Sequence, residues 1–422
     1  MKVTLLCNSD LLGGAAVVTY RLMQALRHAG VDARMLVFSR LSGDPNIQVV
    51  GTRFSRGAAF LAERFRIYAA NGLSYDSLFK VSIANTGHNL AKHPWIKDAD
   101  VVVLNYINQG MLSLKGIRAI GRIGKPIVWT MHDMWCATGI CHHAYECTNF
   151  TAACGECPLL GSDSPNDLSH KTWLRKKALY DSTDITFVAV SRWLARKCAA
   201  SSLLRGRHVA VIPNAFPVDS FDTSISGEYP ALPIDFSKKL ILMGAARLDD
   251  PVKGLDYAVE ALNHLFDNHP EVAKESTAVF FGSLRDPHAL DSLRFPYVWL
   301  GRINDRSLLR KLYAAGTVVL STSLYETLTG TLIEGQAAGC LPVTFGRGGQ
   351  TDIVTHMADG YIADYRSSID IAAGIRWALA RNVNRTALHE SVRTRFAATA
   401  VAQRYISLFR SLLKTHPAQD NN

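Results

Sequence analysis

The feature of this sequence that most restricts its fold is an alternation of short apolar runs with amphipathic stretches, which occurs in two successive series. In the first series the apolar runs are KVTLLC, DARMLVFSR, DADVVVLNY, KPIVWTMHD, DITFVAVS and RHVAVIPN. Between the first two lies AAVVTYRLMQALRHAG, which has helical spacing and ends at Gly30, a natural helix stop. Strands that alternate with helices predict an α/β fold with a parallel sheet covered on both faces.

The second series follows the loop-like segment SGEYPALPIDFSKK and comprises LILMGAA, STAVFFG, YVWLGR, AAGTVVLSTS and GCLPVTFG. A chain of 422 residues is also longer than one hydrophobic core usually supports. We therefore predict two doubly wound domains, residues 1–215 and 237–385, with the boundary between Ala215 and Ser237. Because ligands of open parallel sheets bind at the carboxyl ends of the strands, the residues that follow each strand are the candidate site residues.

The composition indicates a globular chain with an anionic partner. It is 48% hydrophobic and 19% charged, and its formal net charge is +10. This charge favours a nucleotide, a lipid headgroup surface or nucleic acid without choosing among them. No segment approaches the roughly 18 unbroken apolar residues of a membrane span. The start, MKVTLLCNSD, is typical of a strand and not of a signal peptide, so we expect a cytoplasmic protein.

Two strands of the first series are followed by candidate site residues. Gly13 and Gly14 open the first helix without bulky side chains, so their backbone N–H groups are suited to approach a phosphate or a sugar. The alternative is that these glycines serve packing alone. His132 follows KPIVWT, where an imidazole is suited to hydrogen-bond a reacting sugar or to accept a proton. The alternative is a histidine satisfied by a loop carbonyl.

Two cations follow the first strand of the second series. Arg247 and Lys253 flank a loop that enters a helix near Gly254. Cations beside a helix N-terminus form a suitable site for a diphosphate. The alternative is that both are solvated surface charges, the commonest fate of arginine and lysine.

Two glutamates lie in SLYETLTGTLIEGQAAGCLPV, after the strand AAGTVVLSTS. Glu326 lies in a turn, and the N–H groups of a predicted helix beginning at Thr329, Gly330 and Thr331 favour a phosphate. Glu334 lies among aliphatic residues of that helix, where a carboxylate needs a partner. Paired ribose hydroxyls are one suitable partner, and a nearby arginine is the alternative.

Together these motifs resemble the retaining family 4 glycosyltransferases. Glu326 and Glu334 reproduce the E-x7-E signature of that family, and GG, IPNAF, ARLDDPVKG and GRGG occur in the family's order over nearly the whole chain. The resemblance implies the GT-B fold, two Rossmann-like domains that face an inter-domain cleft. The segment HDMWCATGICHHAYECTNFTAACGECPLL further resembles a subgroup that works in bacterial exopolysaccharide and colanic-acid-type assembly.

The resemblance implies a hexosyl- or related glycosyltransferase that uses a UDP- or GDP-linked sugar and a saccharide acceptor, which we expect to be lipid-linked. Arg247 and Lys253 would hold the donor diphosphate, Glu334 the ribose, and Glu326 the donor sugar. No catalytic metal or other cofactor is implied, because cations and helix ends stabilise the leaving diphosphate.

The resemblance also assigns parts of the first domain. His132 would lie near the reacting sugar carbons, and the loop at Gly13–Gly14 across the cleft from the donor. The C-terminal helices of residues 386–415 would pack back toward the first domain. The chain departs from the family at Thr327-Leu328-Thr329, at Gly335-Gln336 and at Asp352, and these departures concern the donor sugar more than the reaction class.

A cysteine-rich loop spans residues 136–160. Its cysteines Cys141, Cys147, Cys154 and Cys157 follow the spacing C-x5-C-x6-C-x2-C, and the last pair is typical of a zinc knuckle. We expect a structural Zn²⁺, because clustered cysteines of a cytoplasmic protein favour metal binding. Two disulfides and reduced, packed thiols are the alternatives, and Cys136, His142 and His143 are alternative ligands.

The segment FSRGAAFLAERFRIYAANG predicts a helix with an apolar stripe. The stripe consists of Phe54, Ala58, Leu61, Phe65 and Tyr68, and Arg56, Glu63, Arg64 and Arg66 lie off it. A basic amphipathic helix of this kind is suited to lie on an anionic membrane, which would make the protein peripheral at the inner face of the cytoplasmic membrane. The alternative is an ordinary helix with its stripe in the core.

Two other functions compete with glycosyl transfer. A GT-B-type sugar-nucleotide epimerase would use the same donor site without an acceptor. A basic, zinc-containing nucleic-acid-binding protein would fit the charge. Nucleic-acid binding predicts aromatic residues interleaved with basic ones, and no such tract is present, so we expect no nucleic-acid partner.

Overall fold

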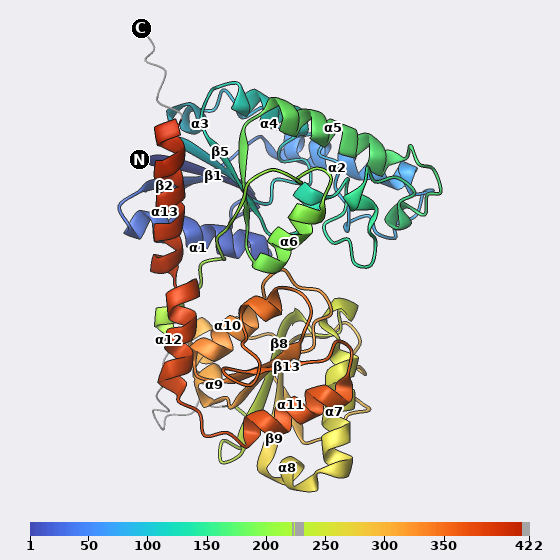
Figure 1. Cartoon of the computed structure of the whole chain (residues 1–422), viewed down its shortest axis with the longest axis vertical. Helices are drawn as coiled ribbons and strands as arrows, with labels where there is room; N and C mark the ends of the chain where they lie inside the picture. The colour runs from blue at the N-terminus through green and yellow to red at the C-terminus, as the bar shows by residue number, and fades with distance from the viewer. Residues whose placement is uncertain (222, 224–231, 416–422) are drawn as a thin grey trace. The chain divides into compact units, whose positions relative to one another are not determined.

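A computed structural model of the chain describes residues 1–221, 223 and 232–415 (Figure 1). The chain divides into two compact units, Met1–Ala215 together with the residues from Val401 onward, and Phe216–Ala400. Residues 226–231, the start of the segment SGEYPALPIDFSKK between the two strand series, lie outside the described residues.

The N-terminal unit is built on a parallel sheet of seven strands in the order β3-β2-β1-β4-β5-β6-β7. The strands are β1 Lys2–Ser9, β2 Asp32–Ser39, β3 Ile47–Val49, β4 Val101–Leu104, β5 Ile127–Met131, β6 Ile185–Ala189 and β7 Val209–Val211. The helices are α1 Gly14–His28, α2 Arg53–Ala70, α3 Pro94–Asp98, α4 Leu114–Gly121, α5 Leu168–Ser182, α6 Arg192–Ala200 and most of α13 Ala398–Thr415.

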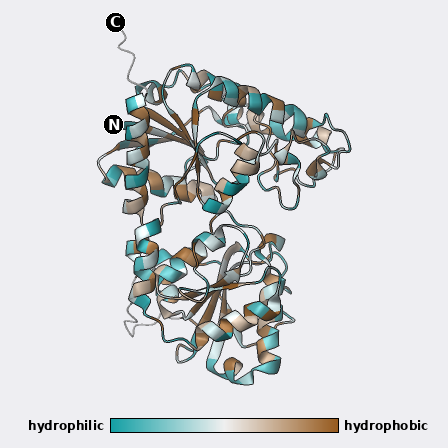
Figure 2. Ribbon diagram, viewed as in Figure 1, coloured by the Kyte–Doolittle hydropathy of each residue, from teal (hydrophilic) through white to brown (hydrophobic). Residues whose placement is uncertain are grey.

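The sequence explains how this unit forms. Every residue of β4 and β5 is buried, and all of them except Thr130 are apolar, as expected for strands covered on both faces. Helix α1 packs against β1 and β2, and its buried residues, among them Leu22 and Leu26, recur with helical spacing. Figure 2 shows the same division, with brown strands inside and teal on the outer faces of the helices.

The C-terminal unit is built on a second parallel sheet, of six strands in the order β10-β9-β8-β11-β12-β13. The strands are β8 Lys239–Arg247, β9 Ser276–Ser283, β10 Tyr297–Trp299, β11 Val318–Ser321, β12 Leu341–Phe345 and β13 Tyr361–Ala363. The helices are α7 Leu255–Asn268, α8 Pro270–Glu275, α9 Arg306–Ala315, α10 Gly330–Ala337, α11 Ser368–Leu379 and α12 Arg385–Phe396. The core of this unit lies where α7 and α11 pack together and against the sheet.

The structure confirms the prediction of two doubly wound α/β domains with parallel sheets, and each predicted apolar run contains a strand. Sequence analysis missed two strands, β3 and β13. Both are three residues long and lie at the edge of their sheet, like β7 and β10, but unlike those two they do not lie within any of the apolar runs by which the strands were recognised.

The C-terminal helices of residues 386–415 divide between the two units. Helix α12 belongs to the C-terminal unit, where it packs on α10 and the Arg385 guanidinium donates to the carbonyl oxygens of Gly316 and Ala338. From Val401 onward, α13 groups with the N-terminal unit. There the buried Tyr405 hydroxyl lies 2.9 Å from the Thr130 hydroxyl of β5.

In the described part of the chain, no helix combines the length and the apolar character needed to cross a membrane.

Candidate functional site

Arg247 and Lys253 lie on the loop at the carboxyl end of β8. Arg247 is the last residue of the strand, and its guanidinium lies 2.8 Å from Asp250. Lys253 ends a short 3₁₀ turn, Pro251–Lys253, and is followed by Gly254, where α7 begins. Gly254 has a φ of 63°, and a Cβ there would lie 2.3 Å from the Thr322 carbonyl oxygen. Glycine at this position therefore lets the β8 loop approach the loop after β11 closely.

The structure brings Lys253 and Glu326 into direct contact. The Lys253 ammonium forms an ion pair with the Glu326 carboxylate, and both side chains are partly exposed. The two loops are also joined through their backbones, because Leu324 N–H donates to the Val252 carbonyl oxygen at 2.8 Å. The Thr322 hydroxyl donates to the Gly254 carbonyl oxygen at 2.7 Å. The pair thus lies on two hydrogen-bonded loops at the carboxyl edge of the neighbouring strands β8 and β11.

The GRGG segment after β12 supports the turn that carries Glu326. Gly349 N–H donates to the Glu326 carbonyl oxygen at 2.8 Å, and a Cβ on Gly349 would lie 1.9 Å from the Thr327 carbonyl oxygen. The Gln350 side chain donates to the Ser323 carbonyl oxygen at 2.9 Å. Gly349 and Gln350 position the turn and were not predicted as site residues, although GRGG was part of the family resemblance.

Helix α10 begins directly after this turn. Thr329 is its N-cap residue and makes no side-chain capping hydrogen bond, so the N–H groups at Gly330 and Thr331 begin the helix without a side-chain cap. Glu334 lies one turn in and is half-buried, not fully buried as its aliphatic neighbours suggested. Burial, with the Glu334 charge as a second cause, raises the pKa of Tyr313 well above its ordinary value.

Two departures from the family pattern have structural explanations in α10. A Cβ on Gly335 would lie 2.7 Å from the Val319 side chain, so glycine lets α10 pack closely on β11. The Gln336 side chain is buried and donates to the Asp359 carbonyl oxygen at 3.2 Å. Both residues hold the helix in place behind its N-terminus.

His132 lies at the carboxyl end of β5 in the N-terminal unit. Its Nε2 is 3.0 Å from Oδ1 of Asn105, which directly follows the neighbouring strand β4, and its side chain is also hydrogen-bonded to Asn214. Burial lowers the pKa of His132 to about 4, although the Asp133 charge and the Asn214 hydrogen bond oppose this shift. The imidazole is therefore neutral at physiological pH. Asn105 and Asn214 were missed from the sequence, though both follow apolar runs.

A buried polar chain begins at the next residue. Asp133 Oδ2 lies 2.6 Å from His142 Nδ1, and His142 Nε2 lies 3.1 Å from the Ser82 hydroxyl. The order is that of a Ser-His-Asp triad, but the Ser82 side chain is fully buried and the Arg64 guanidinium also donates to its hydroxyl. These hydrogen-bonded side chains therefore form a structural connection from α2 to the loop that carries His132.

Gly13 and Gly14 lie between β1 and α1. Gly13 has a φ of 91°, and a Cβ at either glycine would have no neighbour within 4 Å. Packing therefore does not require glycine here, whereas the backbone conformation of Gly13 does. These glycines and His132 belong to the N-terminal unit, whereas the predicted donor-binding residues from Arg247 to Glu334 belong to the C-terminal unit.

The four cysteines of the 136–160 loop line one small cavity of about 20 Å³, together with apolar residues such as Ile140 and Phe150. All eight cysteines of the chain are free. Burial, with charge on the neighbouring thiols as a smaller cause, raises the pKa of Cys141 to about 12 and that of Cys154 to about 11. Within residues 1–221, 223 and 232–415, no three His, Cys, Asp or Glu side chains stand close enough together to hold a metal ion.

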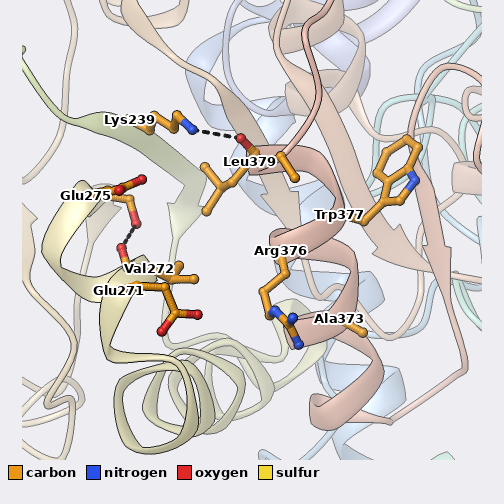
Figure 3. A pocket seen from close by; sticks show the side chains of 10 residues that line it. Lys239, Glu271, Val272, Glu275, Ala373, Arg376, Trp377 and Leu379 are labelled. Atoms are coloured by element: carbon orange, nitrogen blue, oxygen red, sulfur yellow. Dashed lines mark hydrogen bonds between the residues drawn. The ribbon is translucent and has the colours of Figure 1, made fainter.

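A separate cavity of about 510 Å³ lies at the amino ends of β8 and β9 (Figure 3). The Lys239 ammonium donates to the Leu379 carbonyl oxygen at 2.9 Å, and the Ser276 hydroxyl donates to that of Val272. Arg376 is 2.9 Å from a ring nitrogen of His269. The cavity lies at the sheet edge opposite Arg247, so it is not the candidate site.

Two family models match the chain. "Glycosyltransferase Family 4" matches residues 12–220, and "Glycosyl transferases group 1" matches residues 238–381. Among curated proteins, an uncharacterized glycosyltransferase of Methanocaldococcus jannaschii, MJ1607, is 26% identical over 247 residues, which are 56% of this chain and 60% of the relative.

Solved structures resemble the chain over nearly its whole length. HepE of Anabaena, solved with UDP and glucose, is 17% identical with a TM-score of 0.62 over 97% of this chain and all of HepE. A glycosyltransferase of Rickettsia africae is 16% identical with a TM-score of 0.66 over 98% of this chain and 99% of the other. At these identities the likeness supports the fold.

The neutral state of His132 predicts a pH effect on stability. An unfolded histidine has a pKa near 6.5, so between about pH 6.5 and pH 4 the unfolded chain binds a proton that folded His132 does not. The free energy of unfolding should therefore fall as the pH falls through this window. Urea unfolding should show the parent losing roughly 1–2 kcal/mol more than His132→Gln between pH 7 and pH 5. Equal losses in both proteins would contradict a neutral His132 imidazole in the folded protein.

Proposed function

Because the chain belongs to the glycosyltransferases with the GT-B fold, as its Family 4 and group 1 regions indicate, we propose that it transfers a sugar from a nucleotide-sugar donor, with retention of the anomeric configuration. The observation that carries the proposal is the grouping of Arg247, Lys253, Glu326 and the start of α10 at one edge of the C-terminal sheet. HepE of Anabaena, a similar fold, was solved with UDP and with UDP-glucose. This supports UDP as the nucleotide.

The residues of the C-terminal unit have separate roles in the proposal. Arg247, Lys253 and the N–H groups at the start of α10 hold the diphosphate and stabilise the negative charge that develops on it. Glu334 accepts hydrogen bonds from the two ribose hydroxyls. Glu326 accepts hydrogen bonds from the donor sugar. The Lys253–Glu326 ion pair therefore exchanges partners when the donor binds, because lysine turns to phosphate and glutamate to sugar hydroxyls.

In the proposed reaction the acceptor hydroxyl attacks the anomeric carbon on the face from which the diphosphate leaves. The bond from that carbon to the phosphate oxygen breaks, and the hydroxyl proton passes to the departing phosphate oxygen. Neutral His132 provides a hydrogen bond and no charge near the sugar, and the Gly13–Gly14 turn provides backbone N–H groups. No protein nucleophile and no catalytic metal take part.

The acceptor in the proposal is a lipid-linked saccharide, and the process is synthesis of a bacterial exopolysaccharide at the cytoplasmic face of the membrane. The resemblance of the cysteine-rich segment supports this context. The donor sugar, a hexose or a related sugar, depends on Thr327-Leu328-Thr329, which lies next to Glu326.

The donor site is tested by thermal unfolding with UDP-glucose and UDP. Ligand at about 100 times its Kd should stabilise the parent by about 2.7 kcal/mol by mass action. Lys253→Ala and Glu334→Gln should lose most of the shift, and Lys274→Ala, an exposed residue of α8, should keep it. If both site variants respond as the parent does, the donor site is elsewhere. Conversion of UDP-glucose without an acceptor would favour an epimerase instead.

We also propose that Cys141, Cys147, Cys154 and Cys157 hold a structural Zn²⁺. Their thiols surround one cavity with room for a single water-sized sphere, and Gly139 N–H already donates to Cys154 Sγ at 3.2 Å. Metal binding must draw the sulfurs inward to zinc–sulfur distances of about 2.3 Å, since no three of them have that arrangement among the described residues.

Lys176 supports the zinc proposal. Its side chain is fully buried, and its ammonium donates to the Trp135 and Thr138 carbonyl oxygens. The ammonium nitrogen also lies 3.3 Å from the centroid of the Trp135 ring. Among the described residues it forms no ion pair with a carboxylate. Burial lowers the pKa of Lys176 to about 7, and charge on the thiols of Cys136 and Cys141 opposes this shift. A buried cation is costly without an anion, and four thiolates around Zn²⁺ carry a net charge of −2.

Metal analysis tests the zinc site. Protein purified without added zinc should contain about one Zn²⁺ per chain, and chelation should lower its melting temperature. Cys157→Ser should lose the metal, whereas Cys340→Ser, a buried cysteine of the C-terminal unit, should retain it. Substoichiometric zinc in the parent, with no change on chelation, would overturn the proposal regardless of how the variants fold.

A further inference from the structure

Helix α2 is packed with its charged side toward the protein. Its buried residues are Glu63, Arg64 and Ile67. Its large apolar residues Phe54, Leu61 and Phe65 are 86%, 65% and 70% exposed. The apolar stripe predicted from the sequence therefore does not lie in the core, and the ordinary-helix alternative is wrong.

Buried hydrogen bonds fix this orientation of α2. Glu63 accepts from the N–H groups of Ile83 and Ala84 at 2.8 and 2.9 Å, and it forms an ion pair with Arg64 at 3.1 Å. The Arg64 guanidinium donates to the carbonyl oxygen of Val81 at 3.1 Å. Rotating the helix to bury its phenylalanines would expose or break this network, and an unpaired buried charge is costly. The outward apolar face is thus a consequence of the packing.

The segment after α2 extends the apolar face. Leu73, Tyr75 and Phe79 are 62%, 77% and 62% exposed. The segment folds back on the helix, since the ring of Phe79 stacks with Phe60 at 6.4 Å and that of Tyr75 contacts Tyr68 at 5.0 Å. We call the exposed residues Phe54, Leu61, Phe65, Leu73, Tyr75 and Phe79 the α2 surface. Contiguous exposed apolar residues in such number mark an interaction site.

The charges around the α2 surface favour an anionic partner. Between residues 51 and 80 the exposed charged side chains are Arg53, Arg66 and Lys80 against one acid, Asp76. A second copy docked through the same surface would bring like charges together. An anionic bilayer instead accepts apolar side chains among its acyl chains and basic ones at its headgroups.

We propose that the α2 surface docks the protein on an anionic lipid bilayer, with Phe54, Leu61 and Phe65 inserted and Arg53 and Arg66 at the headgroups. Bilayer binding stands on the α2 surface alone. The further statement that bilayer binding brings the protein to a lipid-linked acceptor rests on the proposed function.

The α2 surface is connected to the loop that carries His132. Arg64 donates to the Ser82 hydroxyl, which lies 3.1 Å from His142, and His142 pairs with Asp133 next to His132. Through these contacts a docked α2 holds the His132 loop at a fixed position relative to the bilayer. A lipid-linked substrate would then meet this loop without leaving the membrane.

Co-sedimentation of the full chain with phosphatidylcholine vesicles, with and without phosphatidylglycerol, tests the docking surface. The parent should sediment with the phosphatidylglycerol vesicles, and less so at high salt. Leu61→Ser and Phe65→Ser should each weaken binding about tenfold or more, because each removes one inserted apolar side chain. Ile369→Ser is the matched control, since Ile369 is 67% exposed in the C-terminal unit, and it should bind as the parent does.

Two outcomes would overturn the docking proposal. One is a parent that fails to bind anionic vesicles at low salt, or variants that bind as well as the parent. The other is a concentration-dependent dimer that Phe65→Ser abolishes, which would assign the surface to a second copy. The response of Phe65→Ser to UDP-glucose in thermal unfolding reports the donor site separately. Vesicle binding without any donor response would therefore count against the function and not the docking.

Discussion

The candidate donor site depends on the close approach of three loops at the carboxyl edge of the C-terminal sheet. Parallel strands end at one edge, so the loops after β8, β11 and β12 meet there. They meet at backbone distance only because Gly254 lies against Thr322 and Gly349 lies against Thr327. The same contacts bring Lys253 beside Glu326. A side chain at either glycine would separate the loops. The Lys253–Glu326 ion pair would then be broken as well.

The N-terminal unit supplies a different kind of group. His132 is half-buried and neutral and is held by Asn105 and Asn214, and its neighbour Asp133 is tied through His142 to Ser82. A neutral imidazole suits a site where a sugar must be hydrogen-bonded without a second positive charge. In the proposed reaction the cations remain with the diphosphate, where negative charge develops, and the acceptor side stays uncharged.

The sequence predicted the fold well because buried parallel strands leave continuous apolar runs. Strands β3 and β13 each have one fully buried residue and were missed, although the equally short edge strands β7 and β10 were recognised. The sequence also predicted which residues follow the strands. It did not predict that Lys253 contacts Glu326, since that contact depends on how two loops lie across each other. The orientation of α2 was not predictable from periodicity, because buried partners of Glu63 and Arg64 lie some twenty residues further along the chain.

The central claim is that a nucleotide diphosphate binds where Arg247, Lys253 and the start of α10 meet, and a crystal structure with bound UDP tests it most directly. The account predicts phosphate oxygens within hydrogen-bond distance of both side chains and of the first N–H groups of α10, with Lys253 turned away from Glu326. UDP bound in the cavity beside Lys239 and Arg376, or at any other place with the Lys253–Glu326 pair intact, would contradict it.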